Sequence, residues 1–316
     1  MDGEIESGFI IVKLKIMHQK TLRRTVQKKG FTLIELSVVI VIIGILVTGI
    51  MQGANMVQSS RLSSARAITA KSPIIEIEGL TAWYETSKIS SLELGETIDE
   101  REISTWFDGT PGSTIGLLKE NELTRTASTD IVYENIGINK IPSLHFSNAG
   151  NLTLANLYQG SSAQSTVFLV FRPLASPSST EQILFDAHTS ASDSSSIGIK
   201  NNAICLNAAS GSVCTATTTN AAAFSVNKDY IVSAYFNNTA SRAFVNDPTN
   251  KAGAADIAPG SNELVGLTIG TNKSGASAFI GLISEVIIYN RPLKLQERKD
   301  VMTYLSKKYK VTLTGL

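Results

Sequence analysis

Residues 28–51 read KKGFTLIELSVVIVIIGILVTGIM, in which a glycine separates a basic pair from a long apolar run. Between residues 31 and 51 the only charged side chain is Glu35. As a helix that rises about 1.5 Å per residue, this run can cross roughly 30 Å of hydrocarbon, which no other segment of the chain can do. The alternative is a cleaved secretory signal, whose apolar core is shorter, about 7–15 residues. The run therefore predicts a transmembrane helix.

The leader ahead of this run is positively charged. Between Met17 and Gly30 there are basic residues and no acidic ones. The basic residues are Lys20, Arg23, Arg24, Lys28 and Lys29. Because positively charged flanks stay in the cytoplasm, we expect the N-terminus to lie there and everything after about residue 55 to cross the membrane.

Glu35 places a carboxylate near the end of the predicted span, where an unpaired charge costs on the order of a few kcal/mol. One interpretation is that its side chain reaches back to the lipid headgroups. The other begins at Gly30, since a cut after this glycine leaves a positive α-amine on Phe31. Glu35 is then the fifth residue of the mature chain. The amine of a neighbouring subunit could neutralise the carboxylate.

The order KKG and then FTLIELSVVIVIIGIL strongly resembles the class III signal of type IV pilins and of the pseudopilins of type II secretion systems. The resemblance implies that a prepilin peptidase cuts between Gly30 and Phe31, that Phe31 is N-methylated, and that Glu35 guides assembly into a filament. It implies other pilin or pseudopilin subunits and an inner-membrane assembly machinery as partners. It also implies a single-pass protein of the bacterial inner membrane, with the C-terminal domain in the periplasm and, after assembly, in a filament or at the cell surface.

Two features depart from that family. A leader of 30 residues is long, and a start at Met17 would shorten it to 14. The span also contains no proline, where many pilins carry one. We expect Gly44, Gly49 and Gly53 to supply comparable flexibility, because each glycine weakens a helix by about 1 kcal/mol.

The helix is predicted to continue beyond the membrane to about residue 71. Apolar residues such as Val57, Ala65 and Ile68 recur there at near-helical spacing, and Pro73 then ends the helix. The resulting helix would be roughly 60 Å long. The predicted organisation is a leader over residues 1–30, a transmembrane and assembly helix over 31–71, and one domain over 72–316.

The charge of the processed chain excludes a nucleic-acid surface. The leader holds seven of the 28 basic residues and three of the 27 acidic ones, so the processed chain has a net charge of −3. Ser, Thr, Ala, Asn and Gly dominate residues 143–277, which is typical of exposed β-rich domains. Disorder is the alternative for this composition, but apolar segments recur too regularly for it.

Short β-branched and aromatic segments predict a β-sandwich or jelly roll. The predicted strands cover residues 166–172, 182–186, 196–200, 230–236, 242–245, 264–269 and 279–289. A last helix is predicted over residues 294–309, after Arg291-Pro292-Leu293. The fold class is therefore mainly β: a long N-terminal transmembrane helix, a β-sandwich and a short C-terminal helix.

GLISEVIIYNRPL at residues 281–293 and YLSKKY at 304–309 are similar to the closing strand and helix of concanavalin A-like, laminin-G-type jelly rolls. GLTAWYET at 79–86, STWFD at 104–108 and LHF at 144–146 resemble the opening strands of the same fold. Such domains include carbohydrate-binding modules, adhesive modules and glycosidases. The competing function is therefore a membrane-tethered carbohydrate-binding or adhesive module that does not polymerise and has a glycan as its partner.

We do not expect an enzyme. A retaining glycosidase needs two carboxylates about 5–5.5 Å apart. The close alternations are Glu76 with Glu78 and Glu100 with Glu102, and neither pair lies in a predicted central strand. The three histidines, His18, His145 and His188, have no metal-ligand spacing.

A ligand loop is a further candidate. Asp186, His188 and Asp193 lie at a predicted loop where lectin-like domains bind calcium or a sugar, although solvated loop residues are the commoner outcome. No other cofactor is expected. Trp83 and Trp106 could stack on a sugar ring, but tryptophans are more often buried in a core.

Cys205 and Cys214 are separated by eight residues, LNAASGSV, which contain an ordinary turn. In an oxidising periplasm or at the cell surface they are expected to form a disulfide across a hairpin, stabilising the fold by about 2–3 kcal/mol. Two free buried thiols are the alternative. The sequence leaves open whether the assembly is a pilus, a secretion pseudopilus or a competence filament. The bulky domain favours a minor or tip subunit.

Overall fold

The computed structural model describes residues 30–316 except 112–113, 116–117, 120, 127–129, 158–162, 177–179, 189, 191–192, 194, 210–215, 218–223 and 253–258. The chain divides into two compact units, residues 1–52 and 53–316, which are described separately. Residues 1–29 of the leader lie outside the described residues.

Helix α1 (Leu33–Ala70) runs without interruption through the predicted membrane span and beyond it. Between Leu33 and Met51 its large apolar side chains are 46–87% exposed in the described chain. This helix is long and apolar enough to cross a membrane by length and composition. It ends at Ala70, as predicted, because Pro73 cannot extend it.

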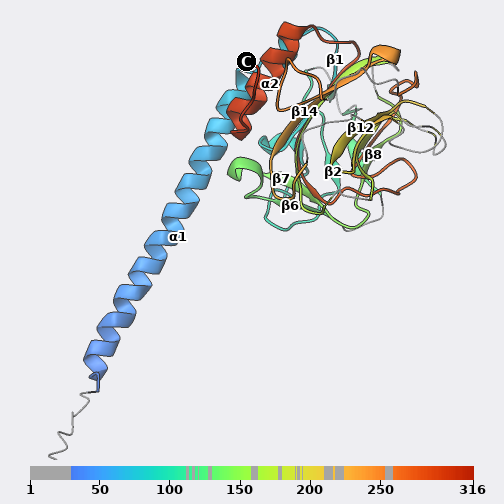
Figure 1. Ribbon diagram of the computed structural model, residues 1–316. Helices are drawn as coiled ribbons and strands as arrows, with labels where there is room; N and C mark the ends of the chain where they lie inside the picture. Colours follow the sequence, from blue (N-terminus) through green and yellow to red (C-terminus); the bar gives the residue numbers. More distant parts are fainter. Residues whose placement is uncertain are drawn as a thin grey trace, which may run out of the picture. The chain divides into compact units, whose positions relative to one another are not determined.

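Residues 80–289 contain two antiparallel sheets (Figure 1). The order of the first sheet is β15 (Arg242–Val245), β14 (Tyr230–Asn237), β9 (Gln164–Pro173), β17 (Gly281–Tyr289), β7 (Ser143–Phe146) and β6 (Ile131–Glu134), and β1 (Leu80–Glu85) also pairs with β17. The order of the second is β13 (Ala216–Thr217), β12 (Ala203–Asn207), β11 (Ser196–Lys200), β10 (Gln182–Asp186), β16 (Leu267–Ile269), β8 (Leu152–Leu154), β5 (Leu123–Arg125) and β2 (Thr105–Trp106).

Small elements complete the described chain. They are the β3 (Thr114–Ile115) and β4 (Leu118–Lys119) pair and the 3-10 turns η1 (Ile74–Glu76), η2 (Ile89–Ser91), η3 (Ile138–Lys140) and η4 (Asn238–Ala240). Helix α2 (Leu295–Tyr309) ends the fold. Its first turn is closed by Glu297, which accepts a 2.7 Å hydrogen bond from the Lys294 amide and pairs with the Arg291 guanidinium at 2.7 Å.

The main core lies between the two sheets, and a second core lies on the outer face of the first sheet. Strand β9 contributes to both because side chains alternate along it. Val167, Leu169 and Phe171 join the main core, whereas Phe168 and Val170 join the second. Burial on both faces explains why residues 167–171 are continuously apolar.

The second core is closed by α2, which lies against the outer face of the first sheet (Figure 1). Val301, Leu305 and Tyr309 of α2 pack there with Ala65, which lies in the last turns of α1. Nearly half of α1, residues 53–70, is thus part of the same compact unit as the sandwich, whereas the predicted organisation grouped residues 31–71 as one helix.

The predicted fold class is confirmed. The long helix, the two sheets and the closing helix are all present. The predicted strand 264–269 is shorter, because the amides of Val265 and Gly266 both donate to the Ala187 carbonyl and the ladder begins only at Leu267.

Candidate functional site

The predicted cleavage site lies immediately before the first turn of α1. Gly30, Phe31 and Thr32 precede the helix, which begins at Leu33, and the Phe31 side chain is 86% exposed. A peptide bond outside regular structure can be extended into a protease without unwinding a helix. The geometry of the described chain therefore leaves the Gly30–Phe31 bond accessible.

Thr32 and Glu35 close the start of the helix with a reciprocal capping box. The Thr32 amide and hydroxyl donate to Glu35 Oε2 at 2.8 and 2.9 Å, and the Glu35 amide donates to Thr32 Oγ1 at 3.2 Å. This pattern satisfies amides that have no partner within the helix. The carboxylate predicted to guide assembly is consequently held at the first turn of the helix, four residues from the predicted new amine.

The predicted flexibility at the glycines has no visible counterpart in α1, which is continuous through Gly44, Gly49 and Gly53. A Cβ added at any of them would meet no atom within 4 Å. The helix surface has no side chain at these three positions, so another helix can approach it closely there.

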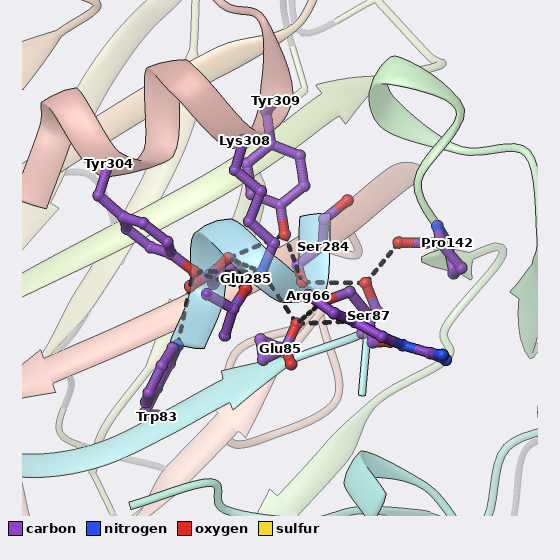
Figure 2. Close-up of polar contacts among 12 residues, drawn as sticks. Arg66, Trp83, Glu85, Ser87, Pro142, Ser284, Glu285, Tyr304, Lys308 and Tyr309 are labelled. Carbon is purple, nitrogen blue, oxygen red and sulfur yellow. Dashed lines mark hydrogen bonds and ion pairs between the residues drawn. The ribbon is translucent and has the colours of Figure 1, made fainter. Parts of the chain in front are cut away.

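A buried charge cluster lies between the first sheet and α2, and sequence reasoning did not find it (Figure 2). Lys308 of α2 is fully buried, and its ammonium lies 2.9 Å from Glu85 Oε2 and 2.8 Å from Glu285 Oε2. Glu85 and Glu285 are register partners on β1 and β17, each 1% exposed. One ammonium thus bridges two carboxylates that face the same side of the sheet.

Four donors surround the Glu285 carboxylate. Its Oε1 accepts from Trp83 Nε1 and from the Tyr304 hydroxyl, both at 2.8 Å. Its Oε2 accepts from Lys308 and, at 2.9 Å, from the Tyr309 hydroxyl. Buried charges are tolerated when they are paired and hydrogen-bonded in this way.

Glu85 has a different environment. Its Oε2 accepts from Lys308 and from the Ser87 amide at 2.8 Å. Burial acts to raise the pKa of Glu85, but the Lys308 charge and the hydrogen bonds from Ser87 and Lys308 outweigh it, and the pKa is lowered. Burial likewise acts to lower the pKa of Lys308, but Glu285 and Glu85 raise it well above its usual range. Glu85 and Lys308 are therefore both charged at neutral pH.

The cluster also reaches the last turns of α1, within the same compact unit. Arg66 Nε donates to the Ser87 carbonyl at 2.7 Å, and the Thr69 hydroxyl lies 3.3 Å from the Tyr304 hydroxyl. Figure 2 shows Arg66 and Ser87 beside the carboxylates. The cluster is buried, so a substrate cannot reach it. Its hydrogen bonds and ion pairs connect three segments of the chain, residues 66–69, 83–87 and 284–309.

Of the three residues in the predicted ligand loop, Asp186 is buried and hydrogen-bonded within the domain. Asp186 is 1% exposed at the end of β10, where its Oδ1 and Oδ2 accept from the amides of Ser195 and Lys273 at 3.1 and 3.0 Å. His188 Nδ1 accepts from the Ser190 amide, and Asp193 is half-buried. Among the described residues no group of three or more His, Cys, Asp or Glu side chains could hold a metal ion. The hydrogen bonds of Asp186 thus hold the loops that contain Ser195 and Lys273 against the end of β10.

The two tryptophans are core residues, as the more common alternative predicted. Trp83 is 3% exposed and Trp106 is fully buried, with its ring 5.6 Å from that of Tyr84. Cys205 is buried on β12, whereas Cys214 lies outside the described residues, so the disulfide stays a prediction. His145 lies on β7 with Nδ1 3.7 Å from Glu134.

Residues 26–51 match the family described as the prokaryotic N-terminal methylation motif. No curated protein sequence matches the chain. Among solved structures, the chain is similar to domain 4 of AbnA, a GH43 extracellular arabinanase from Geobacillus stearothermophilus in complex with arabinotriose. That match has 17% identity over 71% of this chain and 98% of the other, with a TM-score of 0.49.

The chain is also similar to Trypanosoma rangeli sialidase in complex with sialic acid. The identity is 13%, the match covers 74% of this chain and 34% of the sialidase, and the TM-score is 0.44. Likenesses at this level describe neither a ligand nor an activity of this chain.

Proposed function

This chain carries a type IV pilin or pseudopilin signal joined to a β-sandwich, and from this premise we propose that it is a structural subunit of a pilus or a secretion pseudopilus. The signal implies processing by a prepilin peptidase and a membrane-associated, exported protein. In the proposal the peptidase cuts after Gly30 and methylates Phe31, and Glu35 pairs with the amine of Phe31 on an adjacent subunit.

The observation that carries the proposal is the uncovered apolar surface of α1 between Leu33 and Met51. Lipid covers this surface before assembly, and neighbouring helices cover it in a filament. Association of helices in a membrane depends on close packing and on polar partners rather than on the hydrophobic effect. The exposed glycines permit close approach, and Glu35 supplies the polar group.

The proposal gives the sandwich a non-catalytic role outside the membrane. Two of the carboxylates buried in the domain, Glu85 and Glu285, are held by Lys308 in a layer closed to substrate. Glu102, one of the predicted alternating carboxylates, is on the surface and pairs with Arg125 at 3.0 Å. These placements favour carboxylates that stabilise the domain over carboxylates that cleave a glycosidic bond.

The test is Glu35→Gln in the full chain, with Glu76→Gln, an exposed carboxylate of the sandwich unit, as the matched control. The glutamine leaves the neighbour's amine unpaired in hydrocarbon, at a cost of about 2.5–3.5 kcal/mol, or roughly 100-fold weaker association. Mass spectrometry of the mature N-terminus should show a methylated Phe31 in both variants. Filaments sheared from cells should be lost in Glu35→Gln alone.

Filaments at normal yield from Glu35→Gln would show that the carboxylate has no role in assembly. A native chain that is processed but forms no filament would reject polymerisation and leave the tethered carbohydrate-binding module. That rival is tested by a glycan array with the full chain in detergent. A fragment beginning at residue 72 is unsuitable, because it lacks Ala65 and the Arg66 contact to Ser87.

A further inference from the structure

A groove of about 510 Å³ runs along one flank of the last turns of α1, where α1 and α2 lie together. Its floor includes Val57, Ala65, Ile68 and Ile141. Met56 and Val57, at one end, are 75% and 51% exposed. The groove therefore presents an apolar strip that this subunit does not cover.

Positive charge lines the rim of the groove. Arg61, Lys307 and Lys310 are exposed, and Arg61 donates to Asn139 Oδ1 at 3.2 Å, which steadies its side chain. An adjoining hollow shares Ser64, Ile68 and Lys307 and adds Lys71, with Asp300 as its acidic member. The rim thus fits a partner that is acidic and carries an apolar side chain.

Residues 93–102 of the same chain, ELGETIDERE, have that composition. Five carboxylates and one guanidinium lie in ten residues. Two large apolar side chains are also exposed in this acidic segment, Leu94 at 97% and Ile98 at 54%. Leu94 is the most exposed large apolar side chain among the described residues.

The acidic segment is held in place before any partner binds. Glu96 Oε1 accepts from the Ser104 amide at 2.7 Å, Asp99 Oδ1 accepts from the Asn135 amide at 2.9 Å, and the Glu100 amide donates to the Tyr133 carbonyl at 2.8 Å. A segment that is already ordered loses little conformational entropy when it docks.

The groove and the acidic segment are separate surfaces, since no residue of the segment lines the groove. Two different surfaces that complement each other join copies head to tail. Such heterologous contacts generate open filaments rather than closed dimers.

We propose that the acidic segment 93–102 of one copy docks in the groove of a second copy, with Leu94 against Met56 and Val57 and its carboxylates beside Arg61 and Lys310. This inference rests on the proposed polymerisation and assigns the contact between neighbouring sandwiches. The apolar match is what favours a second copy over a small anion, since an anion would leave Leu94 and the apolar floor exposed to water.

The first test is a cysteine pair, Val57→Cys with Leu94→Cys, in filaments of the full chain treated with a short thiol crosslinker. We expect a ladder of dimers, trimers and higher species in the double variant and none in either single variant. Dimers from Val57→Cys alone would indicate a symmetric contact and overturn the proposal.

The second test reverses charge. Arg61→Glu with Lys310→Glu, and separately Glu93→Lys with Glu100→Lys, should each lower filament yield at least about 10-fold, and combining all four should restore it to within about 2-fold. If the native chain forms no filaments, the proposed function fails. If native filaments form, but the cysteine pair gives no ladder and charge reversal changes nothing, only the docking proposal fails.

Discussion

Replacing Lys308 with methionine removes the ammonium that both Glu85 and Glu285 bind, while keeping a flexible side chain of similar length. The two carboxylates are register partners on adjacent strands, and each is 1% exposed. Without the lysine they face each other inside the protein, where a like charge opposes ionisation. The variant therefore tests whether the cluster stabilises the attachment of α2 to the sheet.

The expected cost follows from burial and pairing. Removing one partner of a buried ion pair costs about 3–5 kcal/mol, because it leaves an uncompensated charge in a low dielectric. Lys308 has a fully buried side chain and bridges two such partners, so we expect a loss toward the upper end of that range. Part of the loss is recoverable if one glutamate takes up a proton.

The matched control is Lys307→Met, the same substitution one residue earlier at an exposed position. It should change the free energy of unfolding by less than about 0.5 kcal/mol. Urea unfolding of the full chain in detergent can follow the fluorescence of Trp83 and Trp106. The indole nitrogen of Trp83 donates to Glu285, so part of the signal reports on the cluster.

A rescue variant separates charge from packing. Adding Glu85→Gln and Glu285→Gln to Lys308→Met removes the uncompensated charges, so the triple variant should regain at least half of the lost stability. Equal unfolding free energies for Lys308→Met and Lys307→Met would refute the reasoning. So would a triple variant no more stable than the single one.

Two further predictions concern the same unit. The contribution of Glu85 to stability is present above its unfolded pKa of about 4.3 and is lost as pH falls through its lowered folded pKa; that of Lys308 is present below about 10.4 and is lost as pH rises through its raised folded pKa. In the native chain, urea midpoints should be highest between these two limits and fall outside them. Lys308→Met should lose less stability than the native chain as pH rises, and the loss that remains comes from buried tyrosines such as Tyr304 and Tyr309, whose pKa values burial raises. Gly281→Ala should cost about 1–3 kcal/mol in the same unfolding assay, since its Cβ would lie 2.2 Å from the Arg172 carbonyl oxygen, whereas Gly44→Ala meets nothing within 4 Å and should cause no loss of stability.

Most elements could be predicted from local sequence. The limits of β10, β11 and β15 agree with the predicted strands, and α2 begins one residue later than predicted. Strands β6, β8 and β12 were missed, although β10, β11 and β15 are about as short, so length alone does not decide which strands stand out in the sequence. Strand β6 contains Ile131 and Tyr133, which reach the main core only because β7 pairs beside them.

The candidate assembly residues could be predicted because their chemistry is local. Gly30, Phe31 and Glu35 lie within six residues, and a charge in an apolar run is visible without a fold. The partners of Lys308 could not be predicted, since Glu85 and Glu285 are more than 20 residues away from it in the sequence. Only the register of β1 and β17 places the two carboxylates side by side. The spacing of Lys308 from Val301, Tyr304 and Leu305 places it on the packing face of the helix, but it does not identify the carboxylates that it meets.

The sequence by itself determined the long apolar helix, its N-terminal methylation motif and the succession of most strands, since each depends on contacts within a few residues or on the transfer of side chains from water to hydrocarbon. Only the tertiary structure decided which of two neighbouring lysines is buried, that Asp186 pins loops, and that residues 53–70 belong with the sandwich. These outcomes depend on long-range pairing, in which the free energy of a charge is set by the groups that folding brings beside it.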